Sequence, residues 1–499
     1  MSTSLSNEVM SKPRPWTLPL LFCVAIVCQT AGATTASSRP PNVVLIVADD
    51  LGWNAVGYHN GFVRTPNIDR IAHQGVELDR FYVSPMCSPT RAGLMTGRYA
   101  MRMGMARSVV RPWAKFGLPP EERTLPEALS EAGYAYRGAF GKWHLGHLDP
   151  KWHPLSQGFT EYRGCYNGAA DYFTRDRDGE TDWHHNWDDV DEKGYTTDLI
   201  ADAAASFVRE HSRQEPFFCY VAFTAPHEPL AAPQQYVAQY AKLDDNPADN
   251  KPSEKQLLAA VVASMDDGIG RILKSIQDAG VAENTLVWFI SDNGGVRSVP
   301  GNNAPLRAGK LTVYEGGVRV PAAVWWPGKI DGGRQIQTPI LNTDIMPTLV
   351  KLCGAKEVAP VGPLDGGDVL PALGAKGDAA PPQTRDLYFF TGQTGFEDEQ
   401  LALITPDGWK LIIMGPDVRR AGGYGSPGHR VELYHLGSDP LEKTDRAAAE
   451  PKRVEELGKK LIAFRQSEPA TSLPPMNRKP PQFRLPPKWH NAPLAASSH

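Results

Sequence analysis

Short apolar runs alternate with longer amphipathic stretches along the chain from Pro41 onward. Three of these runs, at 43–48, 217–223 and 286–290, are continuously apolar and have the length of a strand. Runs of this kind are typical of strands that are covered on both faces. Their alternation with helical patterns predicts an α/β fold, in which helices cover both faces of a mainly parallel sheet.

One helix start is marked by its capping residues. Thr124 can cap the helix, Pro126 suits a first turn, and Glu127 completes a capping box. We therefore expect a helix to begin directly after Thr124.

The composition shifts at 374–382, where Gly, Ala and Pro predict a linker after a first, large α/β domain at 41–373. Beyond it, a smaller C-terminal α+β subdomain is expected at 384–468, with a small antiparallel sheet and one helix. The segments that predict its strands and helix are 387–390, 401–404, 409–414 and 451–466. The last stretch, 469–499, is Pro-rich and basic, which indicates either an extended arm on the body or a disordered tail.

The N-terminus has the pattern of a secretory signal peptide at 1–33. Lys12 and Arg14 precede an apolar run at 18–28, and small residues follow at 31–33. This run is about half of the roughly 20 residues that a helix needs to cross a bilayer, so we expect no membrane span. The chain contains no Asn-x-Ser/Thr sequon, which favours bacterial export to the periplasm or the medium.

The composition narrows the class of protein. Of 499 residues, 41% are apolar, and 52 Lys and Arg stand against 56 Asp and Glu. This excludes a disordered chain and a nucleic-acid binder that depends on a strongly basic field. The cysteines outside the signal peptide are too few for a disulfide framework. Whether Cys165, Cys219 and Cys353 include one disulfide stays open, as does the oligomeric state.

Polar residues follow each of the three apolar runs. Asp49 and Asp50 come after the first, His227 after the second, and Asp292 and Asn293 after the third. Ligands of open α/β sheets bind beyond the carboxyl ends of the strands, so these side chains are candidates for one shared site. Taken singly, each residue is better explained as a turn residue after a strand.

Adjacent aspartates in a partly buried site repel each other unless a cation lies between them. The oxygen donors of Asp49, Asp50, Asp292 and Asn293 suit Ca²⁺ or Mg²⁺ and disfavour zinc. We therefore expect a calcium site with room for an oxyanion.

The most specific motif is C-S-P-T-R at 87–91, followed by L-M-T-G-R at 94–98. A lone cysteine in such a turn is usually a buried thiol. The C-x-P-x-R and L-x-T-G-R pattern, however, resembles the signature of the type I sulfatases, in which the cysteine is oxidised to formylglycine. The family pattern continues in order with Asp49-Asp50, Gly141-Lys142-Trp143-His144, His227-Glu228-Pro229, Asp292-Asn293-Gly294-Gly295 and Gly309-Lys310.

The resemblance covers about 41–466 and implies an alkaline-phosphatase-like fold, in which 41–373 is the catalytic domain. It also implies a maturation enzyme that converts Cys87 to formylglycine. As a hydrated aldehyde, this residue offers one hydroxyl to attack sulfur and a second whose deprotonation releases sulfate. The ligands of Ca²⁺ that the resemblance implies are Asp49, Asp50, Cys87, Asp292 and Asn293.

The resemblance assigns the remaining catalytic roles to basic side chains. Arg91 would hold the hydrate, and Lys142 and Lys310 would bind sulfate oxygens. His227 would protonate the leaving alcohol, and His144 would take the proton from the second hydroxyl. Without the signature, these lysines and histidines would be read as surface and core residues.

The middle of the chain is most similar to the arylsulfatase B branch, through 221–230 and 301–307. That similarity implies a sulfated galactose- or N-acetylgalactosamine-type glycan as substrate, although Ala304 stands where the branch usually has Trp. Trp183 and Trp187, within 171–191, either contact a sugar or anchor a loop. Alternatives are a phosphate or phosphonate ester hydrolase, a small aryl-sulfate sulfatase, and a non-catalytic sulfoglycan binder if Cys87 stays unmodified.

Overall fold

The structure is a computed structural model. It describes residues 39–59, 61–177, 179–213, 215–243, 251–356, 361–374, 385–419, 427–476 and 478–483, together with Met10 and Lys12. Nearly all of the expected signal peptide and of the linker, and the end of the tail, thus lie outside the described residues. The chain divides after Arg39, and residues from Pro40 onward form one compact unit. The domain boundaries at 373 and 384 stay predictions.

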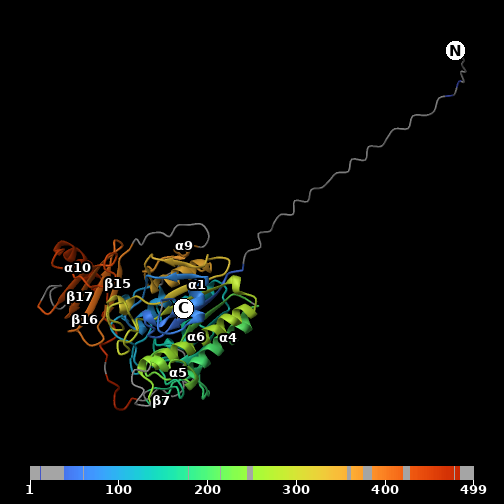
Figure 1. The fold of residues 1–499 in the computed structure, drawn as a ribbon, viewed down its shortest axis with the longest axis horizontal. Coiled ribbons are helices and arrows are strands. Elements are labelled where there is room, and N and C mark those ends of the chain that lie inside the picture. The colour runs from blue at the N-terminus through green and yellow to red at the C-terminus, as the bar shows by residue number, and fades with distance from the viewer. Residues whose placement is uncertain are drawn as a thin grey trace. The chain divides into compact units, whose positions relative to one another are not determined.

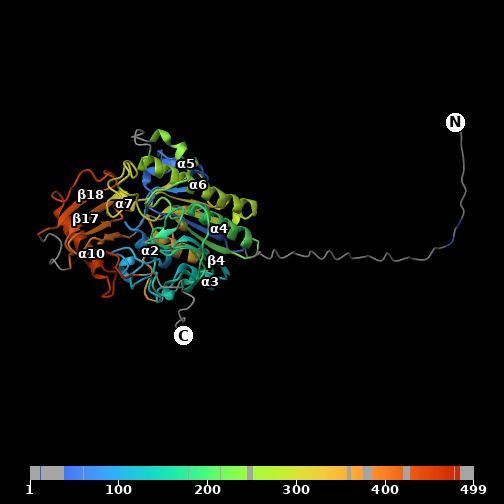
Figure 2. The same cartoon turned by 90° about the horizontal axis from the view of Figure 1, so that it is seen from below.

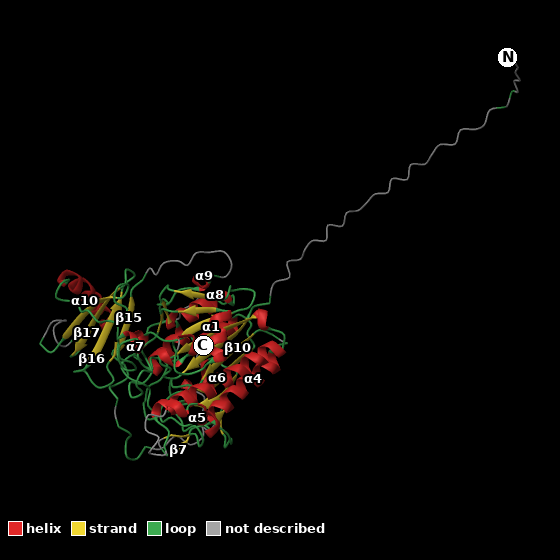
Figure 3. Cartoon of the chain, viewed as in Figure 1, coloured by secondary structure: helices red, strands yellow, loops and turns green. Residues whose placement is uncertain are grey.

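A ten-stranded sheet forms the centre of this unit (Figure 3). The strands are, in spatial order, β13 (Arg334–Ile336), β2 (Val76–Leu78), β12 (Ala322–Trp325), β11 (Thr285–Ser291), β1 (Asn42–Ala48), β10 (Phe217–Ala222), β4 (Tyr136–Lys142), β5 (Glu161–Cys165), β8 (His184–His185) and β9 (Asp188–Asp189). The run from β11 to β5 is parallel throughout, and β12 and β8 join it in antiparallel orientation. The three apolar runs are β1, β10 and β11, which confirms the predicted mainly parallel sheet.

Both faces of the sheet are covered by helices, as the continuous apolar runs predict. Along β1, Val43, Leu45 and Val47 face one apolar layer, and Val44 and Ile46 face the other. The first layer is closed by α2 (Cys87–Thr96), α3 (Leu125–Glu131) and α8 (Ile345–Leu352). The second is closed by α1 (Pro66–Gln74), α4 (Thr196–His211), α5 (Gln234–Gln239) and α6 (Glu254–Asp278). Figures 1 and 2 show α4 and α6 side by side.

Smaller elements complete the main body. Two short pairs of strands are β3 (Phe81–Tyr82) with β14 (Ile340–Leu341), and β6 (Asp176–Arg177) with β7 (Glu180–Thr181). Short helices are α7 (Glu315–Val318) and α9 (Leu370–Leu373). The 3-10 helices are η1 (Trp53–Ala55), η2 (Gly57–His59), η3 (Ala100–Met103), η4 (Pro150–Trp152), η5 (Pro154–Gln157), η6 (Ala241–Leu243), η8 (Ala282–Asn284) and η9 (Asn342–Asp344).

The C-terminal part forms a four-stranded antiparallel meander, seen in orange and red in Figure 1. Its strands are β15 (Leu387–Thr391), β16 (Glu399–Ile404), β17 (Trp409–Gly415) and β18 (Arg430–His435), and α10 (Pro451–Gln466) follows. The predicted sheet and helix are confirmed. Strand β18 was not predicted from the sequence, because Arg430 and Glu432 interrupt its apolar pattern.

A buried ammonium ties this sheet to the main body. Lys410, on β17, has its Nζ 2.8 Å from a carboxylate oxygen of Glu315 and 2.8 Å from one of Glu442. All three side chains are at most 1% exposed. Because breaking a buried ion pair leaves an uncompensated charge, this contact fixes α7 against β17.

The described part of the Pro-rich tail is extended and lies on the body. The backbone N–H of Leu473 donates to the carbonyl of Gly104 (2.8 Å), and that of Met476 donates to Gln393 (2.9 Å). For the described residues, the extended arm is therefore the correct alternative of the two.

The four cysteines of the described residues are buried and free. None of the described helices combines the length and the apolar character that a membrane crossing requires.

The His184 side chain fixes an edge of the central sheet. Its two ring nitrogens lie 2.8 Å from Asp182 and 2.8 Å from Asp189. Burial alone would lower the pKa of His184, but these two carboxylates raise it above its ordinary value near 6.5. Burial alone would raise the pKa of Asp182, and the bond to His184 lowers it.

We predict that replacing Thr124 with Ala lowers the free energy of unfolding by about 1–2 kcal/mol. The Thr124 Oγ1 accepts from the N–H of Glu127 at the start of α3 and donates to the carbonyl of Gln157 (2.8 Å). Denaturant unfolding measures the effect. Thr124→Ser keeps both bonds and should lose much less stability; an equal loss in the two variants would contradict the capping role.

We predict that His184→Gln flattens the pH dependence of thermal stability. Because its pKa is raised in the folded state, His184 stabilises the protein fully below about pH 6.5, and this contribution is lost as the pH rises through the folded pKa. The melting temperature, measured from pH 6 to pH 9, should therefore fall less in the variant than in the wild type. The exposed His185, replaced by Gln, is the control and should leave the slope unchanged.

Candidate active site

The parallel alignment of three strands brings distant residues to one point. Asp49 and Asp50 follow β1, which lies between β10 and β11. The N–H of Asp292, at the end of β11, donates to the carbonyl of Ala48 (3.0 Å), and the N–H of Asp50 donates to Oδ1 of Asp292 (3.2 Å). Carboxylates about 240 residues apart in the sequence therefore share one buried site.

Asp50 adopts a backbone conformation that is rare for a residue with a side chain, with φ of 67°. The N–H of Asp50 bonds to Asp292, as described above. The N–H of the next residue, Leu51, donates to Oγ of Ser291 (3.0 Å). These bonds hold the turn after β1, and strained turns held in this way are frequent at functional sites.

Cys87 opens helix α2 and points at the two aspartates. Its Sγ lies 3.5 Å from Oδ1 of Asp49 and 3.9 Å from Oδ1 of Asp50, and the side chain is 1% exposed. Burial, reinforced by Asp292, raises the pKa of the thiol. An unmodified Cys87 would therefore be a poor nucleophile at neutral pH.

Each carboxylate of the site has a basic partner. Lys142, the last residue of β4, has Nζ 2.6 and 2.8 Å from the oxygens of Asp49. Lys310 lies 2.7 Å from Oδ2 of Asp50. Arg91, one turn after Cys87 on α2, donates to Oδ2 of Asp292 (2.7 and 3.0 Å) and to the carbonyl of Lys142 (2.9 Å).

Burial and these cations compete over the pKa of the carboxyls. For Asp49, burial outweighs Lys142 and raises the pKa to about 7. For Asp50, Lys310 and His227 together outweigh burial and lower the pKa below its ordinary value. The cluster is thus short of positive charge at Asp49, as expected where a further cation belongs.

The two histidines of the sequence pattern lie beside Cys87. Nδ1 of His227 donates to the carbonyl of Glu228 (2.6 Å), and Nε2 lies 3.6 Å from Oδ2 of Asp50. Burial lowers the pKa of His227 to about 3. His144 is 5% exposed, its Nδ1 has no hydrogen-bond partner within the described residues, and burial lowers its pKa too.

The donor set fits a hard divalent cation. Ligand atoms of Asp49, Asp50, Cys87 and His227 all lie within 4.8 Å of one another. Asn293 donates from Nδ2 to Oδ1 of Asp50 (2.7 Å), whereas its buried Oδ1 has no partner among the described residues. An orphaned amide oxygen beside paired carboxylates is a suitable ligand for Ca²⁺. The structure thus gathers all five residues expected at the metal and adds His227.

A cavity of about 170 Å³ opens above Cys87. His144, His227 and Lys310 line it with Cys87, so four of the predicted catalytic residues share one pocket. The other lining residues were not predicted as site residues from the sequence. They are Val109, Val110, Arg111, Pro112, Asn167, Gly168, Arg177, Leu311 and Gln393. Two of them had a usable signal. Asn167 follows parallel strand β5, as the carboxylates of the site follow β1 and β11. Arg177 lies within 171–191, the segment expected either to contact a sugar or to anchor a loop.

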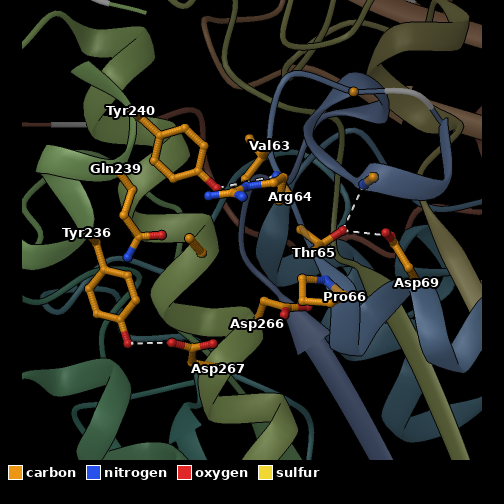
Figure 4. Close-up of a pocket in the computed structure, with 13 residues that line it drawn as sticks. Val63, Arg64, Thr65, Pro66, Asp69, Tyr236, Gln239, Tyr240, Asp266 and Asp267 are labelled. Atoms are coloured by element: carbon orange, nitrogen blue, oxygen red, sulfur yellow. Dashed lines mark hydrogen bonds between the residues drawn. The ribbon is translucent and has the colours of Figure 1, made fainter. Parts of the chain in front are cut away.

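A larger cavity, of about 660 Å³, lies elsewhere, beside α1, α5 and α6 (Figure 4). Its polar groups bond to one another: Tyr236 donates to Asp267 (2.8 Å), and Thr65 donates to Asp69 (2.8 Å). It contains none of the predicted site residues. Chemistry, and not size, therefore selects the smaller cavity as the candidate active site.

The two tryptophans of the segment 171–191 anchor it. The Trp183 side chain is 1% exposed and donates to Glu192 (2.9 Å). Trp187 stacks on His153, with ring centroids 3.8 Å apart. Of the two alternatives for these residues, the structure supports loop anchoring.

Comparison with known proteins gives a consistent result. The family model described as Sulfatase matches residues 41–355. N-acetylgalactosamine-6-sulfatase of Mus musculus is 33% identical over 464 residues, which cover 85% of this chain and 84% of that protein. Arylsulfatase A of Homo sapiens is 35% identical over 392 residues, 72% of each chain.

A solved structure agrees in fold. The structure of Ps i-CgsB in complex with k-i-k-neocarrahexaose is 30% identical and has a TM-score of 0.76, over 86% of this chain and 94% of that one. The family match, the relatives and the fold point the same way: the chain belongs to the sulfatase family and is a sulfuric ester hydrolase.

Proposed function

We propose that this enzyme removes sulfate from a sulfated carbohydrate of the galactose or N-acetylgalactosamine type, by means of formylglycine made from Cys87 and of bound Ca²⁺. The observation that carries the proposal is the position of Cys87. It lies at the floor of a cavity, 3.5 Å from Asp49, and is surrounded by Lys142, Lys310 and Arg91.

The charges of the site favour a divalent cation together with an anionic ester. Three carboxylates (Asp49, Asp50 and Asp292) face three permanent cations (Arg91, Lys142 and Lys310), so the site is close to neutral by itself. A divalent cation leaves it positive, and a sulfate ester compensates that charge.

Two groups of the proposed site, Ca²⁺ and formylglycine, are not encoded in the sequence: the first has to bind, and the second has to be formed from Cys87. Asp49, Asp50, Asp292, Asn293 and residue 87 would hold the Ca²⁺, which polarises a sulfate oxygen when bound. Formylglycine, once formed, supplies a hydrated aldehyde as a nucleophile that can also release sulfate.

The chain's own residues orient the ester and move protons. Lys142 and Lys310, which pair with Asp49 and Asp50, would donate to sulfate oxygens. The bond from Nδ1 of His227 to Glu228 fixes its ring with Nε2 toward the site. An anionic ester beside this ring favours its protonated form, which can then donate a proton to the leaving alcohol. His144, whose buried Nδ1 has no hydrogen-bond partner among the described residues, is the base that takes the proton from the second hydroxyl of the hydrate.

The substrate assignment rests on similarity. The relatives include N-acetylgalactosamine-6-sulfatase, and the solved relative binds a neocarrahexaose. Both indicate carbohydrate esters over simple aryl sulfates for this chain. We also propose that the enzyme belongs to the arylsulfatase B branch. Its pocket would differ from that of the branch because Ala304 replaces the usual Trp.

Export and maturation belong to the same proposal. We propose a Sec-type signal at 1–33 and a periplasmic or secreted enzyme. Because Cys87 is only 1% exposed, a maturation enzyme cannot reach it in the folded protein. Formylglycine formation must therefore precede closure of the site.

We predict sulfate release from 6-sulfated N-acetylgalactosamine or sulfated galactose oligosaccharides by the calcium-loaded enzyme. Ion chromatography measures free sulfate, and peptide mass spectrometry verifies oxidation of Cys87. Cys87→Ala should lower the rate at least about 10³-fold, because it removes the nucleophile.

The matched control is Cys353→Ala, which removes another buried cysteine and should keep most of the activity. If the enzyme, with Cys87 fully converted to formylglycine, leaves every sulfated sugar intact but cleaves phosphate esters, the proposal is overturned.

We predict that chelation lowers both activity and the melting temperature, and that Ca²⁺ restores both. A ligand bound at 100 times its Kd stabilises the folded state by about 2.7 kcal/mol, which corresponds to a shift of a few degrees. Asp50→Asn should abolish this shift in scanning calorimetry. Asp267→Asn, which alters an exposed carboxylate in the larger cavity, should retain it.

A further inference from the structure

Several residues that line the active-site cavity have no role in the proposed reaction. Of the described residues that line it, three carry a permanent positive charge (Arg111, Arg177 and Lys310) and none is acidic. Lys310 belongs to the reaction centre, where it is paired with Asp50. Arg111 and Arg177 line the same cavity from separate segments of the chain and bring guanidinium groups to it.

Asn167 adds a buried donor to the same cavity. The side chain is 2% exposed, and its Nδ2 has no hydrogen-bond partner within the described residues. Leaving a buried donor unpaired is costly, so such groups usually have a ligand.

The position of Asn167 is fixed by hydrogen bonds to residues that do not line the cavity. Its backbone N–H donates to Oδ2 of Asp182 (2.8 Å), and its Oδ1 lies 3.4 Å from Nδ1 of His147. Asp182 is held in turn by His184 (2.8 Å). With its backbone and its carbonyl oxygen occupied, the amide has only Nδ2 left for a ligand in the cavity.

Gln393 lines the cavity from the C-terminal sheet, two residues beyond β15. Its Oε1 is buried and has no partner among the described residues, whereas its backbone carbonyl accepts from Met476 of the tail (2.9 Å). It therefore offers a polar group of a kind that can bond to a sugar hydroxyl or amide N–H.

We propose that Asn167 and Arg177, assisted by Arg111, form a subsite for a second anionic group of the substrate, while Gln393 contacts the sugar that carries the cleaved sulfate. The proposal rests on the proposed function, since it names the substrate class of the same site: a glycan with two anionic groups close together. The reacting sulfate already has Lys142, Lys310 and Arg91 beside Cys87. A buried amide donor next to guanidinium groups suits another anion better than a neutral hydroxyl, because these groups form charge-assisted hydrogen bonds with anions.

The first test compares substrates that differ by one anionic group. The pair is N-acetylgalactosamine 6-sulfate and N-acetylgalactosamine 4,6-disulfate, and a third compound joins the 6-sulfated sugar to a uronic acid. We expect the wild type to prefer a doubly anionic compound by at least about tenfold in kcat/KM. Whichever of the two is preferred identifies the second group as a sulfate or a carboxylate. Equal kcat/KM for all three compounds would overturn the proposal.

The second test removes the subsite. Arg177→Gln should lower kcat/KM for the preferred compound about 10- to 100-fold, as expected for a charge-assisted hydrogen bond, and the effect on the monosulfate should stay below about threefold. Asn167→Asp, which is isosteric but repels an anion, should act in the same direction. Lys193→Gln removes an exposed charge of the same region and should leave both values unchanged. An equal loss on all substrates in Arg177→Gln would indicate a structural role and contradict the proposal.

Binding separates this proposal from the proposed function. In a Cys87→Ala background no turnover occurs, and calorimetric titration should show the preferred doubly anionic compound binding at least about tenfold more tightly than the monosulfate. Arg177→Gln should remove that difference. If oxidised wild type releases no sulfate but the binding difference is found, the catalytic proposal fails and the subsite stands. If sulfate is released and the binding difference is absent, the subsite fails alone.

Discussion

The parallel pairing of β1 with β10 on one side and β11 on the other is the constraint on which the site depends. It directs the carboxyl ends of three strands to one edge of the sheet, so that Asp292 meets Asp49 and Asp50 although about 240 residues separate them in the sequence. Burying three carboxylates together is costly unless cations compensate them. The rest of the site supplies that compensation, through α2, β4 and the segment that carries Lys310.

The same need for charge balance explains how the C-terminal sheet is attached. Glu315 begins α7, five residues after Lys310, and is itself buried. Its partner Lys410 comes from β17, so the C-terminal sheet supplies the charge that stabilises the end of this segment. A sheet that carries none of the predicted catalytic residues thereby helps to fix the position of Lys310.

Much of this arrangement is readable from the sequence, for physical reasons. Continuous apolar runs mark β1, β10 and β11 because both faces of those strands are buried, and Thr124 marks the start of α3 because its side chain bonds the helix N-terminus. The edge strands were not predictable, since β8 and β9 each have two residues and carry polar side chains. The reaction centre was predictable only through a family pattern. Arg177 and Gln393 have no such pattern, because tertiary packing alone brings them to the cavity.

The sequence separation of the strands that carry the site's carboxylates also has a consequence in time. Cys87 is synthesised about 200 residues before β11, which begins at Thr285. At the usual rates of protein synthesis, roughly 5–20 residues per second, this delay is about 10–40 s. During that interval the strand that completes the site does not yet exist, so the cysteine cannot be enclosed. The strand order of the sheet thus builds in a period during which Cys87, which the finished protein conceals, is accessible for the proposed modification.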